Sequence, residues 1–232
     1  MAFFNYCINL PDRDEQSPCL DKILRLKGAM AMIYSEHDKQ KKWLSDLKAA
    51  LLQEAISGEL TADWRAANPD VEPTHMLLER IAEEKAELIR TKQIRKEKPL
   101  PPINPDEVPF DIPSSWEWSQ LGALTTYGTS PKVESSEIES DTWVLDLEDI
   151  EKGSSRIIEK VRLKDRPFNS TKAQFKRGQV LYSKLRPYLD KVVVADEDGV
   201  CTTEILPLPV FCGFSPGYLL FSLKAPHFVE YA

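Results

Sequence analysis

The chain changes character abruptly at residues 99–113, where six of fifteen residues are proline. Proline has no backbone donor and cannot continue a helix, so a segment this rich in proline is extended and semi-rigid. Residues 21–57, by contrast, contain no proline and a single glycine. The sequence therefore predicts a helical region at 1–98, a linker at 99–113 and a second domain at 114–232.

Apolar residues recur at alternating steps of three and four within residues 21–57, which is typical of a helix that packs against another helix. They are Ile23, Leu26, Met30, Ile33, Leu44, Leu47 and Leu51. Gly58 is expected to end this helix, and a second helix is expected from Thr74, as its N-cap, to about Arg95. We expect the two helices to form an antiparallel, coiled-coil-like pair.

The domain after the linker contains runs of β-branched and aromatic residues that are separated by Gly, Pro, Asp and Asn. The expected strands cover residues 142–147, 156–163, 179–183, 191–195 and 200–206, and a helix is expected at 216–231. The fold class is therefore α+β, with the helical pair followed by a mixed, mainly β domain with a few short helices. Nothing caps the last helix, so we expect this domain to be incomplete at its C-terminal end.

Charge is strongly segregated along this acidic chain, whose net charge is -7. Residues 156–191 carry eleven Lys or Arg against three acids, whereas the flanking segments 99–155 and 192–232 are acidic. Cations gathered in this way, and interleaved with tyrosines, favour a large anionic partner, and double-stranded DNA is the one we expect. The alternative is a solvated sheet edge on which Lys residues prevent aggregation.

The basic segment closes on residues 182–191, which hold the candidate DNA contacts. Lys184 and Arg186 are two residues apart at an expected strand end, so both should project to one face. Arg186 is expected to read a base edge through two hydrogen bonds. Phosphate contacts are expected from Lys176, Arg177, Lys184 and Lys191, and neutral hydrogen bonds from Ser183, Tyr188, Thr202 and Thr203. Each of those hydroxyls could equally be satisfied within a turn or strand.

Several segments, taken in order, resemble the specificity subunit of type I restriction-modification systems. They are residues 51–69, 77–85, 112–118 with Leu121-Gly122, 178–192, 198–204 and 215–226. The resemblance implies that residues 114–232 form a target recognition domain and that the helices form a spacer. That family carries two domains and two spacers, so we expect an N-terminal fragment with one domain and part of one spacer.

The same resemblance implies function and partners. It implies sequence-specific reading of one half of a bipartite target, with methyltransferase subunits docked on the helices and a restriction subunit in the full complex. Leu44, Leu47 and Leu51 are the expected partner contacts, although the same residues could form ordinary intrachain core. Methylation and cleavage would belong to partner subunits, so no cofactor is expected here, and S-adenosylmethionine and ATP are expected in the partners.

Other functional classes find less support in the sequence. Asp70 with Glu83 and Lys85 superficially suggests a metal-dependent nuclease, but Glu83 and Lys85 fall on a polar helix face. No glycine-rich turn could cradle a nucleotide, and the acidic run 134–151 lacks the spacing of a calcium loop. A helical scaffold without DNA specificity would explain the helices but would leave the basic segment without a role.

The remaining composition favours a cytoplasmic protein. The cysteines Cys7, Cys19, Cys201 and Cys212 are too widely spaced for a zinc site, and we expect buried, reduced thiols. No apolar run approaches the roughly 18 residues that span a membrane. Residues 1–10 lack the basic flank of a secretory signal.

Overall fold

The computed structural model describes residue 5 and residues 7–231. The expected absence of a secretory signal rests partly on residues 1–4 and 6, which lie outside this description. The chain divides into two compact units, Met1–Ala50 and Leu51–Ala232. The boundary between these units does not fall in the proline-rich segment, so the functional division at residues 99–113 stays a prediction.

The first helix, α1, spans Arg13–Ser57 and begins earlier than its proline-free interior indicated. Asp12 explains the start, because its Oδ1 accepts hydrogen bonds from the backbone N of Asp14 and of Glu15, both at 3.0 Å. A carboxylate at this position satisfies amides that have no partner within the helix. At the other end Gly58 adopts a left-handed conformation with φ of 82°, so the predicted helix stop is confirmed.

Shorter helices follow in the second unit. The connector forms α2, Ala62–Ala67, and the next helix, α3, spans Thr74–Arg90. Its N-cap is Pro73, so the expectation that Thr74 caps it was wrong. Thr74 Oγ1 instead donates to the carbonyl O of Ser115 at 2.9 Å and ties α3 to the chain beyond the linker. Antiparallel pairing of α3 with α1 stays a prediction.

A lysine fixes α3 to the β-rich part of the unit. Lys85 Nζ donates to the carbonyl oxygens of Gly122 and Thr125, at 2.6 and 2.7 Å, at the end of helix α4, Leu121–Leu124. A cation suits this position because the last carbonyls of a helix carry partial negative charge. Single 3-10 turns complete the helices: η2 Glu59–Thr61, η3 Pro105–Glu107, η4 Ser135–Glu137, η5 Leu147–Asp149 and η6 Pro187–Leu189.

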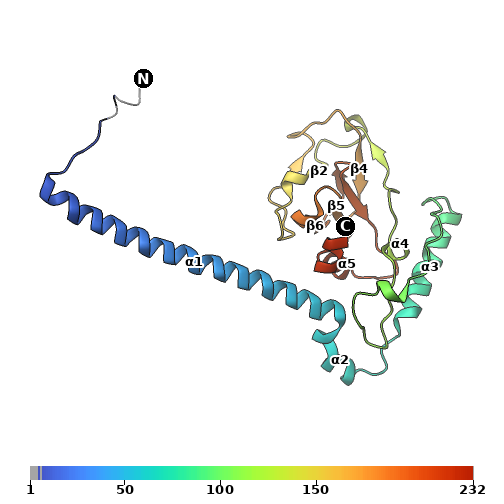
Figure 1. Ribbon diagram of the computed structural model, residues 1–232. Helices are drawn as coiled ribbons and strands as arrows, with labels where there is room; N and C mark the ends of the chain where they lie inside the picture. Colours follow the sequence, from blue (N-terminus) through green and yellow to red (C-terminus); the bar gives the residue numbers. More distant parts are fainter. Residues whose placement is uncertain (1–4, 6, 232) are drawn as a thin grey trace. The chain divides into compact units, whose positions relative to one another are not determined.

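Two sheets form the β-rich part (Figure 1). The five-stranded sheet has the order β1 Lys132–Val133, β4 Lys172–Phe175, β7 Gly199–Cys201, β2 Trp143–Leu145, β3 Val161–Arg162. Its β2 and β7 are parallel and its other pairs are antiparallel. The three-stranded sheet is antiparallel, with the order β6 Val192–Val194, β5 Val180–Ser183, β8 Ile205–Leu208. The α+β fold class is confirmed.

The main hydrophobic core lies between the sheets, where Trp143 and Phe175 of one sheet meet Leu181 and Val193 of the other. Alternate residues of β5 and β6 pack on the opposite face against helix α5, Pro216–Leu223. The ribbon of α5 lies beside these strands in Figure 1. Both faces of these strands are therefore buried, which explains their continuous apolar sequence.

Further details of the expected elements were wrong. Helix α3 ends at Arg90 rather than near Arg95, and only Val161–Arg162 of the run 156–163 forms a strand. The run 200–206 divides between β7 and β8, strand β4 was missed, and the last helix breaks into α5 and α6, Pro226–Tyr231. Proline explains the last break, because it cannot donate to the preceding turn of a helix.

Candidate nucleic-acid interface

Most cations of the basic segment are paired with the chain's own carboxylates. Seven of the eleven Lys or Arg residues in 156–191 form ion pairs, mainly with acids of residues 141–151 and 196–198: Arg156, Lys160, Arg162, Lys164, Arg166, Lys172 and Lys176. The charge of +8 in this segment is therefore not presented to solvent as one patch. The sequence alone overstated the size of this basic patch, because the fold brings the acidic segments on either side of residues 156–191 into contact with its cations.

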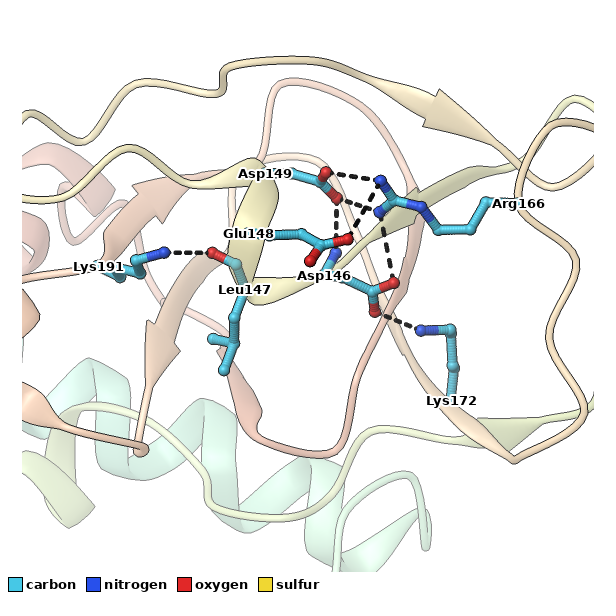
Figure 2. A network of polar contacts seen from close by, with 7 residues as sticks. All are labelled: Asp146, Leu147, Glu148, Asp149, Arg166, Lys172 and Lys191. Carbon is cyan, nitrogen blue, oxygen red and sulfur yellow. Dashed lines mark hydrogen bonds and ion pairs between the residues drawn. The ribbon is translucent and has the colours of Figure 1, made fainter. Parts of the chain in front are cut away.

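One group of these cations builds an internal network, drawn in Figure 2. Arg166 grips Asp149 with both terminal nitrogens, at 2.5 and 2.9 Å, and also lies 3.3 Å from Asp146 Oδ2. Lys172 Nζ reaches Asp146 Oδ1 at 2.5 Å. Asp149 is only 5% exposed, and its hydrogen bond raises the pKa of Arg166. This network stabilises the turn η5 and leaves these cations unavailable to phosphates.

A second group of cations lies at the turn between β4 and β5, against Asp198 of the turn between β6 and β7. Lys176 Nζ is 2.8 Å from Asp198 Oδ2, and the backbone N of Arg177 donates to Asp198 Oδ1 at 2.8 Å. These two donors lower the pKa of Asp198, with the lysine contributing most. Both members of the Lys176–Asp198 pair are exposed, and such pairs contribute about 1 kcal/mol or less. A phosphate could therefore compete for Lys176, and Arg177 has an exposed side chain beside it.

The β5–β6 loop, residues 184–191, presents the remaining cations. Lys184, Leu185, Arg186 and Tyr188 are all exposed. No ion pair is recorded for Lys184 or Arg186 within the described part of the chain. Strand β5 ends at Ser183 and Arg186 has φ of 55°, so the expected strand-like projection of Lys184 and Arg186 was wrong. The two cations share a loop instead of a strand face.

Two other residues that were expected to contact DNA, Ser183 and Lys191, hold this loop in place. Ser183 is buried and its hydroxyl donates to the carbonyl O of Leu185 at 3.0 Å, while Lys191 Nζ donates to the carbonyl O of Leu147 at 2.6 Å (Figure 2). Roles for Ser183 and Lys191 in binding DNA stay predictions, and both groups are occupied here. The sequence pattern did not identify Asp190 and Lys224, whose side chains pair beneath the loop at 2.6 Å.

The turn between β7 and β8 lies next to the loop, because the backbone N of Lys184 donates to the carbonyl O of Glu204 at 3.1 Å. Thr203 in this turn is exposed and Thr202 is half-buried. The structure thus brings together Lys184, Arg186, Tyr188 and the two threonines, whereas Lys176 and Arg177 lie at the separate β4–β5 turn.

The described residues give no support to a metal-dependent enzyme. Lys85 is 13% exposed and committed to carbonyl oxygens, so it does not form a catalytic pair with Glu83. No group of three or more potential metal ligands gathers among the described residues. Within the same residues, no helix is both long and apolar enough to cross a membrane.

Only one of the four free cysteines is buried. Burial raises the pKa of Cys201 to about 12, so its thiol is protonated in the core. Cys7 and Cys19 are exposed, so the expectation of buried thiols was wrong for them.

Comparison with known proteins identifies relatives for this chain, although no family model matches it. Three Escherichia coli proteins are similar, each a type I restriction enzyme specificity subunit. The EcoAI subunit is 44% identical over 81 residues, covering 35% of this chain and 13% of that protein. The EcoEI subunit is 29% identical over 194 residues, covering 81% and 32%. The EcoDI subunit is 28% identical over 203 residues, covering 87% and 40%.

A solved chain is also similar, from a type I R-M system described for its complex assembly and conformational transition. It has a TM-score of 0.41 and 19% identity, and the match covers 50% of this chain and 31% of that one. A score this low carries no argument about the fold. The chain spans 13% to 40% of the length of the curated relatives. These sequence matches, two of which cover more than four fifths of the chain, show that it is similar to type I restriction enzyme specificity subunits.

Proposed function

We propose that this chain recognises DNA sequence within a type I restriction-modification complex and reads one half of a bipartite target. The observation that carries the proposal is the β5–β6 loop, which exposes Lys184 and Arg186 while seven cations of the same basic segment are paired with acids. The names of the relatives, as specificity subunits, support it.

The chemistry of each exposed side chain indicates which part of the DNA it would contact. Arg186 would form two hydrogen bonds with a guanine edge, because its planar guanidinium matches the O6 and N7 acceptors. Lys184 and Arg177 would contact phosphates as exposed cations, and Lys176 would join them by exchanging Asp198 for a phosphate. Tyr188 and Thr203 would add hydrogen bonds from exposed hydroxyls.

The second part of the proposal concerns partners. Leu44, Leu47 and Leu51 are 58%, 41% and 47% exposed on α1. An apolar row of this kind supports docking of another protein, and we assign it to methyltransferase subunits. A restriction subunit would complete the assembly. The chain itself would be non-catalytic and would bind no cofactor, while partners bind S-adenosylmethionine and ATP. We assign the whole assembly to the cytoplasm.

The salt dependence of duplex binding tests the electrostatic part. On a random-sequence duplex Arg186 would contact a phosphate as Arg177 and Lys184 do, so these three exposed cations predict a slope of about -3 for log affinity against log salt. Recruitment of Lys176 and Lys191 from their present partners would steepen it to about -4 to -5. The measurement is fluorescence anisotropy of the purified chain with a random-sequence duplex. A flat salt response would contradict the proposal and favour a protein scaffold.

Selection from a random duplex pool tests sequence recognition. The chain, reassembled with methyltransferase subunits, should enrich one bipartite sequence, and each mismatched base pair should then cost about 1 to 3 kcal/mol. Binding with the expected salt slope but without enrichment would reduce the proposal to non-specific DNA binding.

A further inference from the structure

A lysine buried beneath the β5–β6 loop holds the loop in position. Lys224 caps the C-terminal end of α5, and its side chain is only 3% exposed. Its Nζ lies 2.6 Å from Asp190 Oδ2 and 3.4 Å from the carbonyl O of Gly153. Burying an ammonium group is costly unless it is paired and hydrogen-bonded. The contact with Asp190 therefore fixes the loop to the helix that packs on β6.

The loop backbone needs such support. Arg186 and Asp190 both have left-handed conformations, with φ of 55° and 50°, and they bracket the 3-10 turn η6. Left-handed geometry costs an ordinary L-residue such as arginine about 1–2 kcal/mol, whereas aspartate tolerates it better. Residues keep conformations of this kind only where the surroundings hold them.

The hydrogen bonds of the loop transmit that hold from Asp190 to Arg186. The backbone N of Asp190 donates to the carbonyl O of Pro187, and the backbone N of Leu189 donates to the carbonyl O of Arg186, both at 2.9 Å. These bonds make residues 186–190 one rigid turn whose far end is clamped by Lys224. Arg186 lies at the other end of this turn, so the backbone that carries its exposed guanidinium has a fixed direction.

We propose that Lys224 is a positioning residue for sequence recognition: through Asp190 it fixes the turn that presents Arg186 to DNA. This inference rests on the proposed function and deepens it. A bidentate contact with a base edge requires a guanidinium held in place, whereas a phosphate contact tolerates a mobile cation. Lys224 itself is buried and neutralised, so it adds nothing to the electrostatic attraction of DNA. Its loss should therefore impair specificity and spare non-specific binding.

The test compares three variants of the full chain, Lys224→Met, Asp190→Asn and Lys224→Arg. Asn adopts the left-handed conformation as readily as Asp, so Asp190→Asn removes the charge without adding backbone strain. Each variant is reassembled with methyltransferase subunits, and two probes are used: the duplex that the reassembled wild-type chain selects from a random pool, and a random-sequence duplex. Lys224→Met and Asp190→Asn should lower the ratio of the two affinities about tenfold. Random-duplex affinity and its salt slope should stay within about twofold of wild type, and Lys224→Arg should retain the ratio.

The outcomes separate this inference from the function on which it rests. A wild-type chain that enriches no sequence overturns the proposed function and this inference with it. A wild-type chain that enriches a sequence, with an unchanged affinity ratio in folded Asp190→Asn, overturns this inference alone. Equal weakening on both probes in that variant also overturns it, since a general loss is not a loss of specificity. If either single variant does not fold, the double variant Lys224→Met with Asp190→Asn decides, because it leaves neither charge buried without its partner.

Discussion

Lys191 donates a 2.6 Å hydrogen bond from Nζ to the carbonyl O of Leu147, which joins the end of the β5–β6 loop to the turn η5 (Figure 2). Leu147 is the first residue of that turn, which Asp146 and Asp149 close by a reciprocal capping box. Arg166 binds both of these carboxylates, and Lys172 binds that of Asp146. The β5–β6 loop, which faces solvent, is therefore attached to a turn that is held in place by charged residues outside the loop.

Removal of Arg166 should destabilise the second unit. In Arg166→Gln the carboxylate of Asp149, 5% exposed, loses its bidentate partner, and we expect a loss of about 3 kcal/mol in the free energy of unfolding. Urea denaturation measures it. The control is Arg156→Gln, which breaks the exposed pair with Glu151 and should cost within about 0.5 kcal/mol. Equal losses in both variants would show that the network contributes no more than a surface pair.

Substitution of Arg186 and of Lys184, the exposed cations of the loop, should affect DNA binding in different ways. Arg186→Ala should relax the preference at one base position and weaken binding to the selected duplex by about 1–3 kcal/mol. Lys184→Ala should weaken binding to all duplexes alike and reduce the magnitude of the salt slope by about 1. Anisotropy titrations against single-base variants at several salt concentrations distinguish the two.

Lys164→Ala is the matched control for both loop variants, because Lys164 lies outside the β5–β6 loop and is paired with Asp141 at 3.1 Å. It should change neither the base preference nor the salt slope. An effect as large as that of Lys184→Ala would mean that the paired cations of the basic segment also contact DNA.

Local patterns predicted the elements of this fold well where one physical cause decided them. Gly58 ends α1 because glycine alone adopts φ of 82° without a steric cost, and the apolar runs at β5 and β6 reflect burial on both faces. The start of α1 was missed because Asp12 caps it from outside the periodic region. Strand β4 was missed because Lys172, a residue typical of surfaces, is buried there by its pair with Asp146.

The site was less predictable because charge pairing depends on contacts between distant segments. Lys160 pairs with Asp196 and Arg166 with Asp149, at separations in sequence that no local pattern specifies. One signal was available in the sequence: Lys224 is the single cation of residues 192–232. A lone lysine in an apolar helical segment indicates a buried pair, and its partner Asp190 is one of three acids in the basic segment.

Exposed leucines on α1 should matter for assembly and not for stability. Leu47→Glu places a charge at a position that is 41% exposed, so the thermal unfolding midpoint should stay unchanged while binding to methyltransferase subunits weakens at least tenfold. Ser45→Glu is the control, because it adds the same charge two residues away on another side of the helix. Sedimentation velocity of each variant mixed with those subunits measures assembly. Equal binding by both variants would contradict a docking role for this row.

The pH dependence of stability should report on His227 in α6. Burial lowers the pKa of this imidazole below its ordinary value of 6.5, although Glu230 opposes the shift, and the ring packs edge-on against Phe110 with centroids 5.5 Å apart. Below pH 6.5 the unfolded chain binds a proton that the folded chain still excludes, so this contribution to stability is complete above pH 6.5 and is lost as pH falls toward the lowered pKa. His227→Phe keeps a ring against Phe110 and removes the titrating group, so its unfolding midpoint should fall less than that of the wild type between about pH 6.5 and pH 5. Thermal unfolding across this range measures the difference. Parallel curves for the wild type and His227→Phe would show that the imidazole titrates alike in the folded and unfolded chain.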